Sequence, residues 1–297
     1  MFQALDSLDA IVAAAARHGL ALADPTLDTM GLDFLAVHAR DPDGTRWIVR
    51  APRRADVAAG AAVEARVLAT VRDTLPVAVP DWRIADDVIA YPRLPGTPVV
   101  TLENGAPVWN GVDPAAPARS FLTAIGGTLA ALQRVTDPRL PARTISEERA
   151  ECARIVQRSR ELIDPPESIT ARWQRWVDDD SMWPTHVALS HGDMHPGHLL
   201  LDESGALCGI LDWTEARVGD PGIDFAMMLR CFGRASLETI VEAFAASGGT
   251  MWQRVIDHAV ERESLFPASA ADWAARTNND AILAYAKAEL AKQLAAM

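Results

Sequence analysis

The chain has 297 residues, of which 49% are hydrophobic and 23% charged, a composition ordinary for a globular protein of one domain or two lobes. Its net charge of −12 argues against nucleic acid as a partner, because an acidic surface repels phosphate backbones. No apolar run reaches the roughly 20 residues of a membrane span, and Asp6 and Asp9 stand where a secretory signal would be cationic.

The N-terminal part of the chain alternates helical and strand patterns. The first predicted helix is rich in Ala and ends at Gly19. Two strand candidates flank the turn sequence Asp41-Pro-Asp-Gly44, which predicts a hairpin. A longer stretch then repeats apolar side chains at helical spacing, and two short apolar runs bounded by Pro and Asp follow it. The expected helices are 8–18 and 57–72, and the expected strands are 32–39, 45–50, 77–79 and 88–91.

The segment 92–117 is rich in Pro, Gly, Asn and Asp, so we place a domain boundary there, with domains at 1–95 and 96–297. The second domain is predicted to be mostly helical, and Thr144-Ile-Ser-Glu147 is a capping-box pattern that starts one of its helices. A small β-rich lobe and a larger helical lobe together indicate an α+β protein. The expected helices of the second domain are 120–135, 144–163, 167–177, 223–231, 236–246, 252–262 and 279–296, with short strands at 187–189, 198–201 and 207–211.

The most informative stretch is Leu189-Ser-His-Gly-Asp-Met-His-Pro-Gly-His198. Asp193 follows Gly192 on a predicted tight turn, where its carboxylate can accept the proton of an attacking hydroxyl. Asp212 follows an apolar strand 19 residues later, and one such carboxylate, with phosphates and water, is enough to hold Mg²⁺. Either aspartate alone would be interpreted as a turn cap. The pair at this separation favours phosphoryl transfer, and hence a small-molecule kinase.

The histidines around Asp193 leave two alternatives open. His198 stands five residues after Asp193, where a kinase loop carries Asn as the second metal ligand. Because imidazole is a less natural ligand for Mg²⁺, His198 either contacts a phosphate or metal or holds the loop by hydrogen bonds. His191 and His195 also flank Asp193 in a pattern that resembles a zinc-binding triplet, so a metallohydrolase is an alternative. The Pro-Gly dipeptide that follows His195 indicates a turn instead.

Weaker signals for nucleotide binding lie in the N-terminal part. Gly31, with Asp33 close behind, lies between two strand candidates, where a glycine lets the backbone approach a phosphate or simply makes a hairpin turn. Arg50 closes the second hairpin strand and Glu64 lies on the following helix. A strand cation held by a helix carboxylate positions the phosphates in kinases. Both lysines of the chain lie beyond residue 286, so the cation here is arginine. The alternative is that Arg50 and the neighbouring arginines form a solvated basic edge.

These residues resemble the aminoglycoside phosphotransferase superfamily, which has a protein-kinase-like bilobal fold. The segments SHGDMHPGHLLL and GILDWTEARVGDPGIDF carry the resemblance, and the loop with His198 in place of Asn is similar to that of the macrolide phosphotransferases. The segments GTRWIVRAPRR and VPDWRI also resemble that group. The resemblance implies that Asp193 is the catalytic base and that Asp212 holds the metal, with His198 on the metal or phosphate side. It also implies that Arg50 and Glu64 position the nucleotide.

Further roles follow from the resemblance alone. Tyr91 to Leu94 matches the hinge whose backbone hydrogen-bonds the purine, Leu200 would lie against the purine face, and Asp224 would brace the catalytic loop. The implied reaction moves the γ-phosphate of GTP, or of ATP, to a hydroxyl of a macrolide amino sugar, the 2′-hydroxyl by family analogy, with Mg²⁺ as the metal. This reaction would inactivate the antibiotic.

A macrolide needs an apolar cleft, which we expect among the helices beyond residue 105. Its amino sugar is cationic, which suits the carboxylates near Asp193. Most of the apolar candidates for the cleft are expected to be core residues instead. These candidates are Trp109, Trp173, Trp176, Met182, Trp183 and 227–229.

Two rival functions remain at this point. One is a kinase for another small hydroxyl compound, such as an aminoglycoside, a choline-like alcohol or a sugar. The other is a nucleotide-binding pseudokinase with a regulatory role: intact Asp193 and Asp212 argue against it, whereas Arg50 and His198 keep it open. The cysteines are scattered, lack metal-ligand spacing and favour buried thiols in a reducing cytoplasm. We therefore expect a cytoplasmic protein whose partners are a purine nucleotide and a small molecule, with no protein partner implied.

Overall fold

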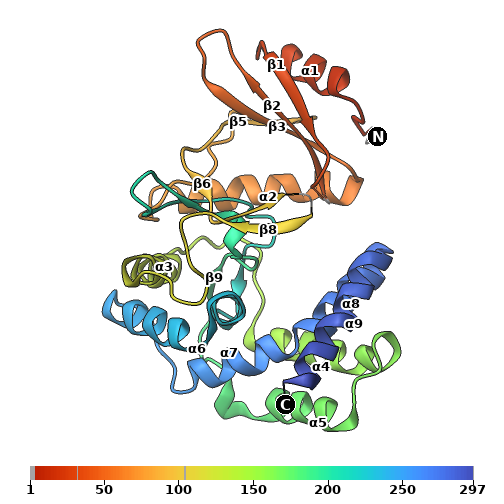
Figure 1. Ribbon diagram of the computed structural model, residues 1–297, viewed down its shortest axis with the longest axis vertical. Coiled ribbons are helices and arrows are strands. Elements are labelled where there is room, and N and C mark those ends of the chain that lie inside the picture. Colours follow the sequence, from red (N-terminus) through yellow and green to blue (C-terminus); the bar gives the residue numbers. More distant parts are fainter. Residues whose placement is uncertain (1–3, 32, 104, 297) are drawn as a thin grey trace. The chain divides into compact units, whose positions relative to one another are not determined.

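The computed structural model describes residues 4–31, 33–103 and 105–296, and Figure 1 shows their helices and strands. The predicted α+β class is confirmed, because the N-terminal part is rich in strands and the C-terminal part is mainly helical. The chain divides into two compact units. Unit 1 contains the described residues up to Val112, Val135–Pro141 and Pro196–Ala216; unit 2 contains Asp113–Arg134, Ala142–His195 and the described residues from Arg217 onwards.

Unit 1 is built on an antiparallel sheet of strand order β1-β2-β3-β5-β4. The predicted hairpin is confirmed as β2 (Phe34–Arg40) and β3 (Arg46–Pro52). Its turn is closed by Asp41, whose carboxylate accepts the backbone N–H of Thr45 at 2.9 Å, and helix α1 (Leu8–Arg17) covers one face of the sheet (Figure 1). Leu32, where the predicted strand 32–39 begins, lies outside the described residues.

Strand β1 (Ala23–Asp28) was not predicted, because its sequence ADPTLD is polar and contains a proline. It exists by pairing with β2 at the edge of the sheet, with Thr26 opposite His38. Helix α2 (Ala55–Val71) matches the helical spacing of the predicted stretch 57–72 and buries one face. An edge strand with a weak pattern is therefore recognised only from the strand it pairs with, whereas a helix of this length is recognised from its own periodicity.

Two short strands, β4 (Ile84–Ala85) and β5 (Ile89–Pro92), complete the sheet, and β5 confirms the predicted strand 88–91. The prediction of a strand at 77–79 is wrong. Only Ala78 forms an isolated bridge, to Gly209, because prolines bound this short run on both sides.

The Pro- and Gly-rich segment 92–117 contains strands that its composition did not reveal. The hairpin of β7 (Val100–Glu103) and β8 (Ala106–Trp109) lies there. Strand β6 (Thr97–Pro98) joins a second sheet of order β11-β10-β6. In that sheet β10 (Leu199–Leu201) and β11 (Leu207–Ile210) form an antiparallel hairpin, close to the predicted strands 198–201 and 207–211.

In unit 2, helices α3 (Arg119–Leu132) and α6 (Gly222–Ala246) pack at close range. A Cβ on Gly126 of α3 would lie 2.5 Å from the carbonyl oxygen of Ile240, so the absent side chain permits the approach. Helix α6 contains the two helices predicted at 223–231 and 236–246, which are joined across a kink. Gly233, with φ 76°, lies between their expected ranges as a non-helical residue inside α6.

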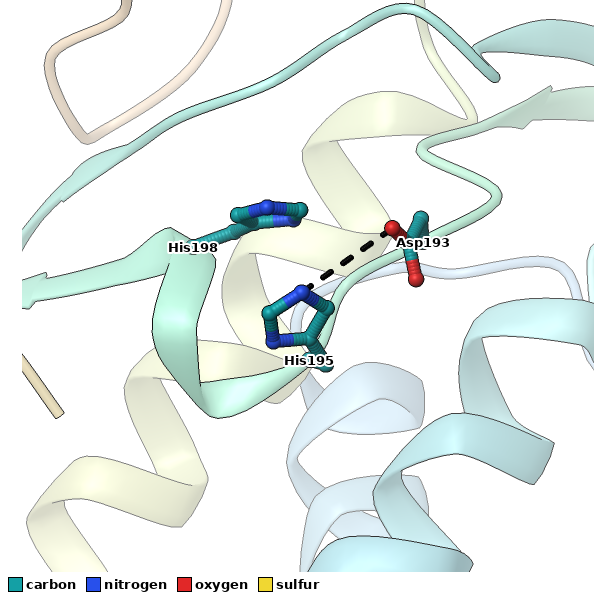
Figure 2. Close-up of side chains that lie close together, drawn as sticks. All are labelled: Asp193, His195 and His198. Carbon is teal, nitrogen blue, oxygen red and sulfur yellow. Dashed lines mark ion pairs between the residues drawn. The ribbon is translucent and has the colours of Figure 1, made fainter. Parts of the chain in front are cut away.

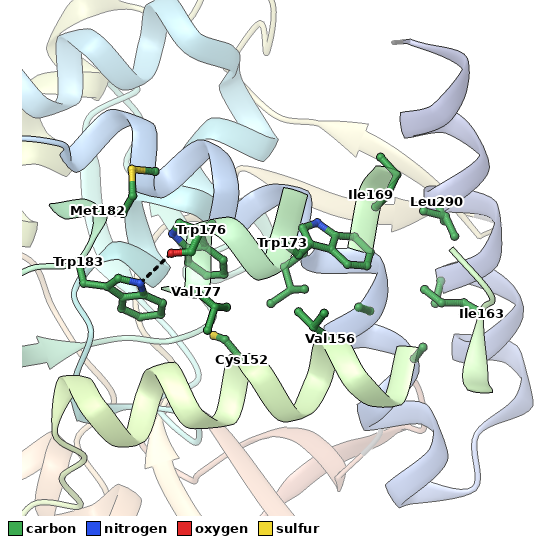
Figure 3. Packing of buried hydrophobic residues seen from close by; sticks show 14 residues of the cluster. Cys152, Val156, Ile163, Ile169, Trp173, Trp176, Val177, Met182, Trp183 and Leu290 are labelled. Atoms are coloured by element: carbon green, nitrogen blue, oxygen red, sulfur yellow. Dashed lines mark hydrogen bonds between the residues drawn. The ribbon is translucent and has the colours of Figure 1, made fainter. Parts of the chain in front are cut away.

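The other helices of unit 2 enclose its main core. The capping box of Thr144 and Glu147 is confirmed at the start of α4 (Ile145–Leu162). Helix α8 (Phe266–Thr277), which follows α7 (Val255–Ser264), was not predicted. Figure 3 shows the core, in which Trp173, Trp176 and Trp183 pack with exposed fractions of 0–4%. The expectation that most of the apolar cleft candidates are core residues therefore holds for these three. The elements are α4 (Ile145–Leu162), α5 (Glu167–Asp178), a 3-10 helix (Asp180–Met182), α7 (Val255–Ser264), α8 (Phe266–Thr277) and α9 (Asp280–Ala295).

Strand β9 (Ala188–Ser190) pairs with β12 (Arg217–Gly219) in unit 2 and leads into the segment that carries Asp193. This pairing fixes where that segment begins. Within the described ranges, none of the helices combines the length and apolar character of a membrane span.

Candidate active site

The loop that carries Asp193 is tied to helix α6 by the carboxylate of Asp224. The backbone N–H groups of His191 and Gly192 donate to its two oxygens at 2.8 and 2.9 Å. Gly192 has φ 84°, a conformation that glycine adopts without strain and that turns the chain sharply after β9. The side chain of Asp193 itself is 41% exposed. The loop thus holds a partly exposed carboxylate on a fixed backbone, as the prediction for Asp193 requires.

Asp224 is buried at the start of α6. Burial raises the pKa of its carboxyl to about 6, although the two backbone hydrogen bonds act in the opposite direction because they stabilise the charged form. The resemblance implied that Asp224 braces this loop, and the contacts of the carboxylate are those of a brace.

Two histidines of the same loop differ in their surroundings. His191 is fully buried, and its Nδ1 accepts the backbone N–H of Asp193 at 3.2 Å. His195 is partly exposed, with Nε2 3.9 Å from Asp193 Oδ2, the ion pair that Figure 2 marks with a dashed line. His191 therefore serves the loop backbone, and the zinc alternative loses one of its predicted ligands.

Asp212 and His198 are brought together within unit 1 by the hairpin of β10 and β11. Leu199 pairs with Ile210, and the N–H of Leu211 donates to the carbonyl of His198 at 2.9 Å. As a result, His198 Nε2 lies 3.8 Å from Asp212 Oδ2. The backbone of Asp212 is left-handed, with φ 56°, and its side chain is 42% exposed. A partly exposed carboxylate is a fitting ligand for a hard cation such as Mg²⁺.

Thr214 joins this aspartate to helix α2. Its hydroxyl donates to Asp212 Oδ1 at 2.7 Å and also lies 3.2 Å from Glu64 Oε2. The two carboxylate oxygens are therefore alternative acceptors for the single hydroxyl hydrogen. Sequence reasoning assigned Thr214 no role of its own, because it appeared only within the segment GILDWTEARVGDPGIDF. The separation of 150 residues from Glu64 left no local signal for this contact.

Arg50 and Glu64 form the predicted ion pair, with Arg50 Nη1 3.2 Å from Glu64 Oε1. Only 8% of Arg50 is exposed, and its guanidinium stacks 3.8 Å from the centre of the Phe34 ring. Burial is the largest single influence and acts to lower the pKa of Arg50, but the charges of Glu64, Tyr91 and Asp212 together with the hydrogen bond to Glu64 raise it above its ordinary value. For Glu64 burial acts in the other direction: it raises the pKa of the carboxyl, against the effect of Arg50. The solvated basic edge is therefore wrong for Arg50.

The two arginines that follow β3 hold the loop around Gly31. Arg53 donates from Nε to the carbonyl of Gly31 at 3.0 Å and from Nη2 to that of Thr29 at 2.7 Å. Arg54 Nη2 lies 2.7 Å from Asp33 Oδ1. The structure thus places Gly31 and Asp33 in one arginine-bound loop, and Asp33 supports that loop through Arg54.

The residues expected around the purine fall into two groups in unit 1. Tyr91 lies in β5, where its buried ring packs with Phe34 and where burial raises the pKa of its hydroxyl. Leu94 and Leu200 both lie against Gly209: a Cβ there would be 3.5 Å from Leu94 Cδ1 and 3.1 Å from Leu200 Cδ1. The two leucines are therefore neighbours, whereas the side chain of Tyr91 belongs to the core beside Arg50.

A buried polar network in unit 2 escaped sequence reasoning. Asp220 Oδ2 lies 2.8 Å from His258 Nε2 and 2.7 Å from Arg262 Nη1. Trp176 Nε1 donates to His258 Nδ1 at 3.2 Å, so His258 carries its hydrogen on Nε2 and donates to Asp220. Burial acts to raise the pKa of Asp220, but His258 and Arg262 hold it well below its usual range. This network joins α5, α7 and the start of α6.

Comparisons with known proteins show the family and the fold of the chain. A family model described as the phosphotransferase enzyme family matches residues 26–258. The solved structure of a macrolide 2′-phosphotransferase type I is 37% identical, with a TM-score of 0.86 over 97% of this chain and 98% of that one. The apoenzyme of macrolide 2′-phosphotransferase MphH from Brachybacterium faecium is 35% identical, with a TM-score of 0.85 over 95% and 97%. The uncharacterized protein YcbJ of Bacillus subtilis (strain 168) is 36% identical over 262 residues, which cover 86% of this chain and 85% of that protein.

Proposed function

We propose that this chain, which belongs to the phosphotransferase enzyme family and has its kinase-like fold, phosphorylates a macrolide antibiotic. The proposed donor is GTP, with ATP as the alternative, and the proposed acceptor is the 2′-hydroxyl of the amino sugar. The observation that carries the substrate class is the 37% identity and TM-score of 0.86 to a macrolide 2′-phosphotransferase along nearly the whole chain. We further propose that the protein acts in the cytoplasm, where both nucleotides are available.

In the proposed reaction, Asp193 accepts the proton of the sugar hydroxyl as the hydroxyl oxygen bonds to the γ-phosphorus. The bond from that phosphorus to the bridging oxygen of the β-phosphate breaks, and GDP leaves with that electron pair. The loop geometry supports this role, because Asp224 fixes the backbone while the Asp193 carboxylate stays 41% exposed. The product carries a phosphate in place of a hydroxyl, which would inactivate the antibiotic.

Asp212 is the proposed ligand of Mg²⁺, which when bound neutralises charge on the phosphates. Its partly exposed carboxylate suits this cation, and His198, 3.8 Å away, is proposed on the metal or phosphate side. The proposed nucleotide lobe comprises residues 1–95 and the catalytic and substrate lobe residues 96–297. The proposed nucleotide-binding residues are Gly31, Asp33, Arg50, Glu64, Tyr91, Leu94, His198 and Leu200.

The test is a turnover screen of purified protein with labelled GTP and ATP against macrolides, an aminoglycoside and choline. We expect phosphate on a macrolide and a product whose position is assigned by NMR. Asp193→Asn should lower kcat by about 100- to 10,000-fold, the usual contribution of a positioned base. Asp113→Asn is the control, because it makes the same substitution in an exposed turn outside the proposed site, where Asp113 accepts the backbone N–H of Ala115 at 2.9 Å. Turnover of another hydroxyl compound but of no macrolide would contradict the proposed substrate.

A further inference from the structure

Three acidic and hydroxyl side chains of unit 1 form a continuous hydrogen-bonded chain that the proposed reaction does not yet use. The Thr214 hydroxyl has one hydrogen, and two carboxylate oxygens compete for it: Asp212 Oδ1 at 2.7 Å and Glu64 Oε2 at 3.2 Å. Glu64 in turn binds Arg50 at 3.2 Å. The expected metal-holding residue and the expected phosphate-positioning pair are thereby connected through one side chain.

The electrostatics give Thr214 a specific task. Glu64 and Asp212 are both acidic, and one oxygen of each lies within hydrogen-bond distance of the same Thr214 hydroxyl. A shared hydroxyl hydrogen lies between these two carboxyl groups and reduces their repulsion. Without it, the partly exposed Asp212 can rotate away from the buried Glu64.

The backbone of Asp212 makes its orientation sensitive to such a contact. Asp212 is in the left-handed region, with φ 56°, where a residue other than glycine needs support from its surroundings. The N–H of Thr214 lies 3.4 Å from the same Oδ1 that its hydroxyl contacts at 2.7 Å. The backbone N–H and the side-chain hydroxyl of Thr214 therefore both contact the same oxygen of Asp212.

We propose that Thr214 is a positioning residue that orients the carboxylate of Asp212 for the nucleotide-bound divalent cation and couples it to the Arg50–Glu64 pair. This inference rests on the proposed function only for the metal role of Asp212. A serine at position 214 keeps the hydroxyl, whereas valine keeps the branched shape and removes it.

The experiment measures Mn²⁺ binding to the full-length protein with GDP by electron paramagnetic resonance, with no macrolide present, for Thr214→Val, Thr214→Ala and Thr214→Ser. We expect about tenfold weaker Mn²⁺ binding for valine and alanine, the effect of losing a hydrogen bond to a charged group, and binding within about twofold of wild type for serine. The matched control is Thr70→Val in helix α2, which removes a hydroxyl that contacts Asp137 at 3.2 Å. Circular dichroism shows which variants are folded.

A kinetic arm separates this inference from the proposed function. If macrolide turnover is found, Thr214→Val should lower kcat by about 10- to 100-fold with little change in the KM for the macrolide, and Thr214→Ser should restore kcat. If no macrolide is turned over but Mn²⁺ binding falls as expected, the substrate proposal fails and the role of Thr214 stands. Three outcomes would overturn the role of Thr214. Folded Thr214→Val or Thr214→Ala could bind Mn²⁺ as well as wild type does, Thr214→Ser could lose binding, or wild type could bind no Mn²⁺.

Discussion

The carboxylate of Asp224 accepts the backbone N–H of Gly192 at 2.9 Å, so the residue directly before Asp193 is held by a buried acid. The same carboxylate binds the N–H of His191 at 2.8 Å. Because burial raises the pKa of Asp224 to about 6, the group that holds the loop changes its charge in an accessible pH range. The geometry of the loop is thereby linked to pH.

Activity should fall as the pH drops through about 6, because protonated Asp224 loses an acceptor for one of the two N–H groups. Asp224→Asn should lower kcat by about 10- to 100-fold at neutral pH, since it leaves one N–H facing an amide donor. The Asn variant should also lack the transition near pH 6. The measurement is kcat against pH for wild type, Asp224→Asn and Asp113→Asn, and an unchanged transition in Asp224→Asn would refute the assignment.

Stability should respond to Asp224 in the opposite direction. The folded-state pKa of about 6 lies above the ordinary value of 3.8, so the folded state binds this proton more tightly than the unfolded state. The contribution of Asp224 to the free energy of unfolding should therefore be complete below about pH 4 and be lost as the pH rises through about 6. Urea titrations of wild type and Asp224→Asn across this range measure it, and a difference that is constant with pH would exclude the linkage.

Removing one partner of the Arg50–Glu64 pair should lower the free energy of unfolding by more, per residue changed, than removing both partners together. Arg50→Met leaves the buried Glu64 carboxylate without its cation and should lower the free energy of unfolding by about 3–5 kcal/mol. Glu64→Met should act similarly, while the double variant should lose clearly less than the sum. Urea denaturation of all four proteins gives the coupling energy. The control is Arg72→Met, which breaks an exposed pair with Asp81 and should change stability by less than about 1 kcal/mol.

Asp220→Ala should be among the most destabilising single changes in unit 2. It removes the acceptor of the His258 N–H and the nearer carboxylate of the buried Arg262 guanidinium, which keeps only the longer contact with Glu148 at 3.6 Å, and the loss corresponds to about 3–5 kcal/mol. Since the pKa of Asp220 is held well below 3.8, its charge supports stability at neutral pH, and this support is lost only at pH values below about 4. Thermal unfolding at neutral pH checks the loss. Asp257→Ala, which breaks an exposed pair with Arg254, should leave the midpoint nearly unchanged.

Adjacent glycines in α3 should give opposite results. Gly126→Ala places a Cβ 2.5 Å from the carbonyl oxygen of Ile240 and should destabilise the protein by about 1–3 kcal/mol. Gly127→Ala meets nothing closer than 3.6 Å and should stabilise it by up to about 1 kcal/mol through helix propensity. Urea denaturation of the two variants tests whether α3 and α6 are in contact as described. Equal effects at the two positions would be inconsistent with this packing.

Local patterns in the sequence determined the helices with strong periodicity and clear ends. The capping box at Thr144 and the turn at Asp41 depend on neighbours within four residues, so they could be predicted. The loop of Asp193 could also be singled out, because its residues lie side by side in the chain. By contrast, the edge strand β1 and the hairpin strands β7 and β8 have weak strand sequences. Strand β1 exists by pairing with β2, and β7 and β8 pair with each other.

The sequence by itself determined which residue types were available for chemistry: Asp193, Asp212 and an arginine in place of lysine at position 50. Only the tertiary structure decided how they are supported. It buried Arg50 against Phe34 and Glu64, and brought Thr214 to Glu64 across 150 positions. Such pairings follow from burial and hydrogen-bond satisfaction over the whole fold. A sequence pattern does not show which polar groups that are distant in the chain will be buried next to one another.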